Sequence, residues 1–477
     1  MAKKAMLGHK IRRLRREHDA TQAEMAERLG ISPSYLNLLE NNQRQVTVDL
    51  LLKIGQAFDV DLQSFAEDDG ARLVGGLQEV FGDPLFEGAD IKRQDIAELA
   101  SAVPAAAEAV ITLYRAYGEM REDMQLVTEK MADGEGGQAP GTSGSALEEV
   151  RDYFHAQDNY FPALEDAAVE ICRAGGLEAG GLHRGLVDYL DRELTVRVKV
   201  MPIDVLGPIR RRYDRHGRRV LLSEMLSPPS RNFQLAAQIG LIKYRGLLDR
   251  MVADAGLSGD AAARLGKIGL ANYLAGAVLM PYDRFYRAAT ALRYDIEVLR
   301  RRFESSFEQV CHRLTTLQRP GAKGVPFFMI RVDNAGNVSK RFSANRLHFA
   351  RFGGACPRWN VHDAFGAPGH ILRQVSEMPD GDRYFSIART VEKEGTGHRL
   401  PGQTYAVALG CEIAYAAQLI YADGVDLGTD DIAVPIGLHC RLCERVDCSQ
   451  RAFPPVQHTL TIDENVRGAT PYVFEPR

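Results

Sequence analysis

The stretch Thr21-Gln-Ala-Glu-Met-Ala-Glu-Arg-Leu-Gly-Ile-Ser-Pro-Ser-Tyr-Leu-Asn-Leu-Leu-Glu-Asn41 predicts two short helices joined by a tight turn. Thr21 and Glu24 have the spacing of a capping box, which marks the start of the first helix. Gly30 marks its end, because glycine readily takes the left-handed conformation that closes a helix. Ser32 then caps a second helix, and the proline that follows suits the first helical position.

The residues around this stretch add one helix on each side. Residues 1–18 hold seven Lys or Arg against one Glu, a local charge of +6 in a chain whose formal charge is −4. Leu7, Ile11 and Leu14 give this basic segment an apolar stripe, and 48–58 reads as a fourth helix. A basic helix before two helices at a glycine-containing turn is the geometry that lays the second of the two in a DNA major groove.

The stretch from Thr21 to Asn41 resembles the helix-turn-helix of the phage-repressor (XRE) family over its whole length. The resemblance implies that Gln22 contacts a phosphate, that the second helix faces bases or backbone, and that Arg44 holds the flanking strand. The residues assigned to DNA binding are Gln22, Ser32, Ser34, Tyr35, Asn37 and Arg44. The alternative is a small helical domain that binds proteins.

Length and composition indicate a multidomain globular protein. The chain has 477 residues, of which 45% are apolar and 26% charged, so two to four domains are expected. No run approaches the roughly 18 apolar residues that a membrane span needs, and we expect a cytoplasmic protein. Seven cysteines in a reducing compartment are metal ligands or reactive thiols rather than a disulfide framework.

A helical connector follows the first domain. Residues 66–131 are rich in Ala, Glu and Leu, and 96–117 carries an apolar stripe. This stripe either joins two copies of the chain, as paired half-sites would require, or belongs to a plain spacer. The Gly-rich segment 133–145 reads as a flexible linker and a domain boundary.

The middle of the chain mixes helices and strands. We expect a helix over 146–171, a strand over 194–200, and a hairpin over 210–222 that turns near His216 and holds six arginines. The hairpin is either a phosphate site or a solvated ribbon. The next element, Arg231–Tyr244, reads as a buried helix and contains no Asp, Glu, His, Cys or Ser.

The order of these elements resembles the ImmA/IrrE-like zinc peptidase domain. Ala237 and Leu241 occupy the positions of that family's two histidines, Gln238 that of its general base, and Leu270 that of a further carboxylate ligand. Two imidazoles one helical turn apart plus a carboxylate are what hold zinc and activate its water. We therefore expect the fold without the peptidase chemistry, no enzyme activity, and a cleft that holds another ligand.

The C-terminal part changes to short strands. Hairpins are expected at 327–342 and 370–391, followed by a helix over 403–421 that carries Cys411. Cys172 and Cys311 stand alone in helical sequence and are expected to be core residues.

Three cysteines within nine residues then form a candidate metal site. The spacing of Cys440, Cys443 and Cys448 lets successive thiolates point at one centre. Zinc would need a fourth ligand, for which Cys411, Cys356 or His439 are candidates, whereas a four-iron cluster accepts three thiolates and a labile position. The alternative is three free thiols.

The whole chain resembles the short-chain fatty acyl-CoA transcriptional regulators, most specifically at Arg351–Trp359 and Cys440–Arg451. The expected fold is α+β and multidomain: an all-α helix-turn-helix domain (1–66), a helical connector and linker (67–145), a zinc-peptidase-like α+β domain (146–318) and a small α+β domain (319–477). The resemblance implies a regulator of propionate or acetate metabolism that senses an acyl-CoA, and a [4Fe-4S] cluster on Cys440, Cys443 and Cys448. Cys411 is added here as a fourth ligand, with structural zinc as the alternative metal.

The acyl-CoA ligand needs a basic wall for its phosphates and an apolar end for its acyl group. The candidate residues are Lys199, Arg218, Arg231, Phe233, Lys243 and Tyr244. The expected partners are double-stranded operator DNA, the acyl-CoA and further copies of the chain, as a dimer or a dimer of dimers. Two alternatives stay open: a redox or iron sensor that uses the cysteines, and a regulatory zinc peptidase.

Overall fold

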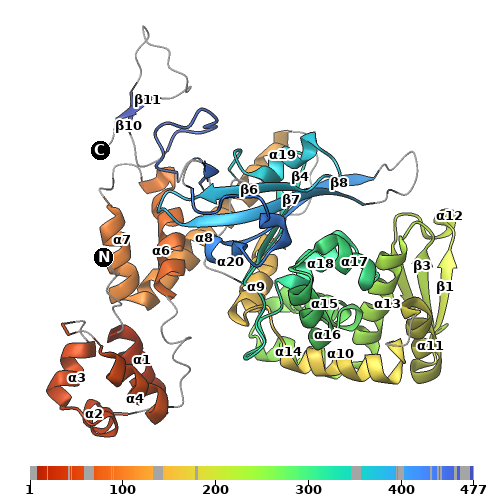
Figure 1. The fold of residues 1–477 in the computed structure, drawn as a ribbon, viewed down its shortest axis with the longest axis horizontal. Coiled ribbons are helices and arrows are strands. Elements are labelled where there is room, and N and C mark those ends of the chain that lie inside the picture. Colours follow the sequence, from red (N-terminus) through yellow and green to blue (C-terminus); the bar gives the residue numbers. More distant parts are fainter. Residues whose placement is uncertain are drawn as a thin grey trace. The chain divides into compact units, whose positions relative to one another are not determined.

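The computed structural model (Figure 1) describes residues 8–18, 20–40, 43–44, 46–58, 69–86, 89, 91–132, 143–177, 181–344, 356–393, 395, 402–429, 432–437, 440, 443–455, 459–461 and 473–475. Most of the predicted linker (133–145), the first half of the motif 351–359 and His439 lie outside these residues. The chain divides into two compact units, Met1–Gly118 and Glu119–Arg477, which are described separately.

The first unit begins with the four predicted helices. They are α1 (Gly8–Glu17), α2 (Gln22–Leu29), α3 (Pro33–Glu40) and α4 (Val48–Phe58). The capping box is confirmed: the Glu24 N–H donates to the Thr21 hydroxyl, and the Thr21 N–H donates to the Glu24 carboxylate. Gly30 closes α2 at φ +65°, a left-handed conformation that suits glycine. Ile11, Met25, Leu36 and Ile54 are fully buried and bring one residue from each helix into a common core.

Three further helices follow, and the last of them begins in the first unit and extends past Gly118. They are α6 (Asp69–Phe81), α7 (Arg93–Ala102) and α8 (Pro104–Ala132), with a 3-10 turn, η1 (Pro84–Phe86), after α6. The predicted helical stripe over 96–117 is thus divided at Val103, because Pro104 cannot continue α7. Leu77, Ile96 and Ala107 form a small core between the three helices.

The second unit begins with a series of helices interrupted by a small sheet. The helices are α9 (Ser143–Ala156), α10 (Pro162–Ala174), α11 (Leu182–Leu194), α12 (Ile203–Leu206), α13 (Pro228–Lys243), α14 (Arg245–Asp254), α15 (Gly259–Leu279), α16 (Tyr282–Ala291), α17 (Ile296–Arg302) and α18 (Phe307–Leu314). The expected single helix over 146–171 is wrong: Asp158 and Asn159 have positive φ, and Pro162 starts a new helix. The expected helix at 231–244 is confirmed as α13.

The small sheet has the order β1-β3-β2. Its strands are β1 (Arg197–Met201), β2 (Arg211–Asp214) and β3 (Arg219–Ser223). The predicted arginine-rich hairpin is confirmed as β2 and β3, which pair antiparallel, while β1 pairs parallel to β3. Figure 1 shows this sheet beside α11 and α13.

A second sheet of six strands has the order β5-β4-β8-β7-β6-β9. The strands are β4 (Phe328–Asp333), β5 (Val338–Ser343), β6 (Leu372–Glu377), β7 (Arg383–Lys393), β8 (Gln403–Glu412) and β9 (Val434–Pro435). Short helical pieces lie between them: α19 (Asn360–Asp363), η3 (Ala364–Gly366), α20 (Ile413–Ala416) and η4 (Ile420–Ala422). A two-stranded ribbon, β10 (Thr459–Thr461) and β11 (Val473–Glu475), follows. Both predicted hairpins are confirmed, as β4–β5 and β6–β7.

The helix expected over 403–421 is a strand for most of its length. In β8, Val407 and Leu409 join the larger core, which includes α13, α15 and α18, while Ala406 and Ala408 join the core on the opposite face of the sheet. A strand buried on both faces lacks the apolar–polar alternation by which a strand is recognised, so its composition resembled a helix.

Among the described residues, no single helix is long and apolar enough to cross a membrane. Residues 93–102 and 104–118 reach that length and composition only as a pair bent by 115°.

Candidate functional sites

Helix α3 presents a polar face and buries an apolar one. Ser34 and Asn37 are exposed, whereas Leu36 is fully buried. The Ser32 hydroxyl accepts the Tyr35 N–H at 3.1 Å, so Ser32 caps the helix, and Tyr35 is half-buried against the core. The exposed amide and hydroxyl are groups that can pair with base edges. Arg44 is exposed after the end of α3.

A buried carboxylate, Glu40, joins the first three helices. It is 3% exposed and accepts two hydrogen bonds from the Arg15 guanidinium, at 2.6 and 3.1 Å. The Gln22 amide donates to the same carboxylate at 2.8 Å. Burial by itself would raise the pKa of Glu40, but the hydrogen bonds from Arg15 and Gln22, with the charges of Arg15 and Arg12, lower it. The residue that we assign to a phosphate contact, Gln22, is therefore held at the start of α2 by an ionised partner that sequence reasoning missed.

The positions that correspond to zinc ligands lie between α13 and α15. Ala237 is 2% exposed, Gln238 5% and Leu270 fully buried. Gly240 lets the helices approach so closely that a Cβ there would lie 2.9 Å from the Leu274 Cδ2. Apolar packing between helices thus occupies the place where metal ligands would be needed.

Two candidate acyl-CoA residues lie together at the C-terminal end of α13. The Lys243 ammonium donates to Glu170 at 2.9 Å and to the Tyr189 hydroxyl at 2.8 Å, and the Tyr244 hydroxyl donates to Glu170 at 2.8 Å. The ammonium also lies 5.4 and 5.7 Å from the centres of the Tyr189 and Tyr244 rings. Burial and the Glu170 carboxylate raise the pKa of Tyr244. We call Glu170, Tyr189, Lys243 and Tyr244 the α13 polar cluster.

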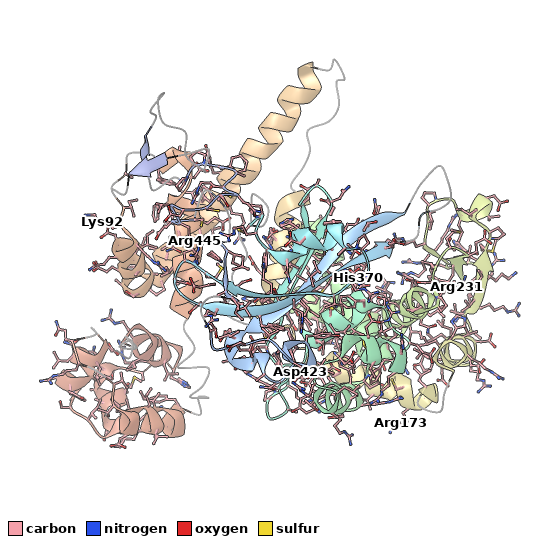
Figure 2. All side chains as sticks on the ribbon, turned by 45° about the horizontal axis from the view of Figure 1, so that its top comes forward. Lys92, Arg173, Arg231, His370, Asp423 and Arg445 are labelled. Carbon is pink, nitrogen blue, oxygen red and sulfur yellow. The ribbon has the colours of Figure 1, made fainter. Side chains whose placement is uncertain are left out.

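The other candidate ligand residues lie elsewhere. Arg231 (labelled in Figure 2) is 12 residues before Lys243 on α13, about 18 Å away along the helix axis, and donates to the Glu224 carbonyl at 2.7 Å. Arg218 donates to the Leu194 carbonyl. The chosen basic residues are therefore spread over α13 and the small sheet, and the structure does not bring all four together. Lys199 is exposed on β1, an edge strand, and Phe233 is partly buried against the core.

Arg451 organises the cysteine loop. It is 4% exposed and donates to the backbone carbonyls of Cys440, at 2.7 Å, and Cys443, at 2.9 Å. The Cys440 sulfur accepts the Ala452 N–H at 3.5 Å. Arg445 (labelled in Figure 2) donates to the Glu377 carbonyl at 2.8 Å and so ties the loop to β6.

The nearest further cysteine is Cys356. Burial, followed by the charges of Cys440 and Cys443, raises the pKa of its thiol, against hydrogen bonds from the backbone N–H groups of Gly437 and Arg358. A Cβ on Gly437 would lie 2.8 Å from the Cys443 sulfur, so this one residue touches both thiols.

Cys411 lies elsewhere, contrary to the sequence-based choice of fourth ligand. It is fully buried in the larger core with Leu409, on the opposite face of the sheet from Cys356. Cys172 and Cys311 are core residues, as predicted. Within the described part of the chain, no three His, Cys, Asp or Glu side chains are close enough together to hold a metal ion.

Three segments of the chain match known families. Residues 11–65 match a helix-turn-helix family, 192–315 the IrrE N-terminal-like domain, and 316–472 the family described as "Short-chain fatty acyl coenzyme A regulator, C-terminal".

Relatives match over nearly the full length. The propionyl-CoA carboxylase regulator of Cereibacter sphaeroides is 42% identical over 473 residues, which cover 99% of each chain. The regulators RamB and PrpR of Mycobacterium tuberculosis are 41% and 40% identical, over 99% and 98% of this chain and 99% and 95% of theirs. A solved structure, described as a Mycobacterium tuberculosis transcriptional regulator, is 43% identical with a TM-score of 0.66, and the match covers 69% of this chain and 99% of that one. RamB and PrpR are named as HTH-type transcriptional regulators, and the chain described here also contains the IrrE-like segment.

Proposed function

Because the chain belongs to the family of short-chain fatty acyl-CoA transcriptional regulators, we propose that it controls propionate or acetate metabolism by binding operator DNA and a short-chain acyl-CoA. The observation that carries this proposal is the contrast within α13. Its middle holds apolar residues where a peptidase needs zinc ligands, and its end holds the ordered α13 polar cluster. Such a helix can contribute to ligand binding, but it lacks the side chains that peptide hydrolysis at a zinc ion needs.

DNA recognition is assigned to α3. Its exposed Ser34 and Asn37 would read base edges, while Gln22 and Arg44 would fix the register on phosphates. The Glu40 network holds α1, α2 and α3 in one orientation, which fixes how α3 is presented to the DNA. A homodimer or dimer of dimers would bind paired half-sites.

The acyl-CoA is assigned to the second unit, with the α13 polar cluster as its strongest contact. Lys243 supplies a cation for a phosphate, and Tyr189 and Tyr244 supply ring faces and hydroxyls beside it. The partners that hold Lys243 reduce the conformational entropy that it loses on binding. The ligand changes operator affinity only by binding one conformation more tightly than the other.

The test is a titration of the full-length protein with propionyl-CoA and acetyl-CoA, with free coenzyme A beside them. A ligand at 100 times its Kd stabilises the folded state by about 2.7 kcal/mol, which a thermal scan detects. Lys243→Met should weaken binding about tenfold, and Lys323→Met, at an exposed lysine, should not change it. If no acyl-CoA changes thermal stability or operator affinity, the proposed effector is wrong.

A metal centre on the cysteine loop is the second proposed element. Cys440, Cys443 and Cys448 would hold it once their sulfurs draw closer together than in the described structure, and the placement of Cys356 favours that residue as fourth ligand. The Ala452 N–H donates to the Cys440 sulfur, and Arg451 fixes the Cys440 carbonyl. Both contacts would help to orient the thiolate of Cys440 toward a metal. A [4Fe-4S] cluster would add a redox input, whereas zinc would only brace the loop. Anaerobic purification, metal analysis and the visible spectrum distinguish the two; a protein with neither metal would exclude both.

A further inference from the structure

Three cations converge on one carboxylate where α18 lies against the six-stranded sheet. The residues are Glu308 in the first turn of α18, Arg331 on β4, Lys340 on β5 and Lys393 at the end of β7, which together we call the cationic cluster. Glu308 Oε1 accepts from Arg331 Nη1 at 2.7 Å and lies 2.8 Å from Lys340 Nζ. Lys393 Nζ lies 3.7 Å from Glu308 Oε2.

The cluster carries excess positive charge. Burial would raise the pKa of Glu308, but the charges of Lys340, Lys393 and Arg331 lower it to about 2, so the carboxylate is ionised. Within the cluster, three cations against one anion leave a charge of +2, and the positive charge of Arg210 also acts on Lys393. The side chains of Arg331 and Glu308 are only 9% and 14% exposed, so water screens this charge incompletely.

The register of the sheet makes the excess positive charge of the cationic cluster unfavourable. Arg331 on β4 pairs directly with Lys340 on β5, and like charges at directly opposite positions destabilise a strand pair. The ring of Tyr405 on β8 lies 4.5 Å from the Arg331 guanidinium and 5.2 Å from the Lys393 ammonium. A ring attracts cations without neutralising them. Burial, with the charges of Arg331 and Lys340, lowers the pKa of Lys393 to about 8, against the pull of Glu308.

Some hydrogen-bond donors in the cationic cluster are not used in hydrogen bonds to the described residues. A lysine ammonium has three donors, yet Lys393 makes no hydrogen bond to the described residues, since 3.7 Å is too long for one. Arg331 uses its Nε for Ser339 and its Nη1 for Glu308. The side chains of Lys340 and Lys393 are 41% and 27% exposed, which makes the cluster reachable from solvent.

We propose that the cationic cluster is a binding site for a phosphate dianion. The two charges of the dianion match the excess of the cluster, and guanidinium and ammonium donors suit phosphate oxygens. The phosphate belongs either to a small phosphorylated metabolite or to coenzyme A. Glu308 lies in the IrrE-like segment and the three cations lie in the C-terminal segment, so a phosphate that binds the cations competes with the ion pairs that join the two segments. This site is separate from the α13 polar cluster and does not rest on the acyl-CoA assignment.

The probe is inorganic phosphate, titrated into the full-length protein at constant ionic strength with chloride as the comparison anion. Phosphate should raise the thermal midpoint of the wild type above its value in chloride, with a saturable heat of binding. Lys340→Gln and Lys393→Gln should each weaken phosphate binding at least tenfold, while Lys323→Gln, at an exposed lysine outside the cluster, should not. Glu308→Gln removes the competing internal anion, so binding should be retained or tightened.

Three outcomes overturn the proposal. Equal effects of phosphate and chloride on the wild type would mean that no specific site exists. Binding by both lysine variants within twofold of the wild type would mean that the cluster only braces the interface with α18. Loss of binding in a folded Glu308→Gln variant would mean that the carboxylate is required, which contradicts the charge argument.

The two sources of phosphate are separated by competition. If coenzyme A displaces inorganic phosphate and 3′-dephospho-coenzyme A does not, the site binds the 3′-phosphate of the coenzyme. If neither displaces it, the ligand is a separate phosphorylated molecule. Both results support a phosphate site. In either case the Lys393→Gln variant should bind the ligand more weakly than the wild type.

Discussion

Replacing Arg313, which forms a buried ion pair, should destabilise the second unit more than replacing a residue of any exposed ion pair. Its guanidinium donates to both oxygens of Glu165, at 2.7 and 2.9 Å, and to the Met280 carbonyl at 3.0 Å. The two side chains are 2% and 7% exposed. Burial would lower the pKa of Arg313, but the Glu165 carboxylate raises it above its ordinary value, so the pair is ionised.

Arg313→Met removes the cation and leaves Glu165 in the core with the Tyr273 hydroxyl, at 2.5 Å, as its remaining partner among the described contacts. Breaking a buried pair in this way costs about 3–5 kcal/mol. For a domain of roughly 150–250 residues, each kcal/mol lowers the midpoint by about 2–4 °C, so a fall of about 6–20 °C is expected. Glu165→Gln combined with Arg313→Met should recover at least half of this loss, because no buried charge then stays unpaired.

The assay is a thermal scan of the full-length protein by circular dichroism, with operator binding at low temperature as a check on the first unit. The matched control is Arg184→Met, which breaks the exposed Arg184–Asp188 pair and should cost at most ~0.5 kcal/mol. A decrease of less than about 2 °C in the thermal midpoint of Arg313→Met would refute the reasoning. So would a double variant no more stable than the single one.

Three other predictions concern the DNA-binding helix, acid stability and the cysteine loop. Asn37→Ala should weaken specific operator binding by about 1–3 kcal/mol without lowering the thermal midpoint, because the side chain is exposed; DNA titration at fixed salt measures this. Burial lowers the pKa of His312 to about 3, so the unfolded chain takes up a proton near its ordinary pKa of 6.5 before the folded protein does. Stability from this group is complete above pH 6.5 and is lost as the pH falls toward 3; His312→Phe should flatten that part of the stability profile. Cys356→Ser should lower the metal content of the purified protein, whereas Cys411→Ser should lower the thermal midpoint and leave metal content unchanged, as metal analysis of both variants would show.

The predictable parts of this protein are those whose signals are local. The capping box at Thr21 and Glu24 and the closing glycine at position 30 specify α2 by contacts within a few residues, so the helix-turn-helix followed from sequence alone. The hairpin of β2 and β3 followed from its turn. The absence of Asp, Glu, His and Cys from Arg231–Tyr244 is likewise a property of the sequence.

The β8 strand and the cysteine partners could not be predicted, because each depends on which face of a sheet a residue occupies. Strand faces are set by pairing between segments distant in the chain, and a strand buried on both faces has no alternation to reveal it. That pairing placed Cys411 in the core on one side and Cys356 on the other, beside the cysteine loop. It also brought the cations of the cationic cluster together from three strands. The sequence by itself determined the DNA-binding module and the apolar make-up of the middle of α13 through local patterns, and only the tertiary structure decided which distant charges and thiols meet.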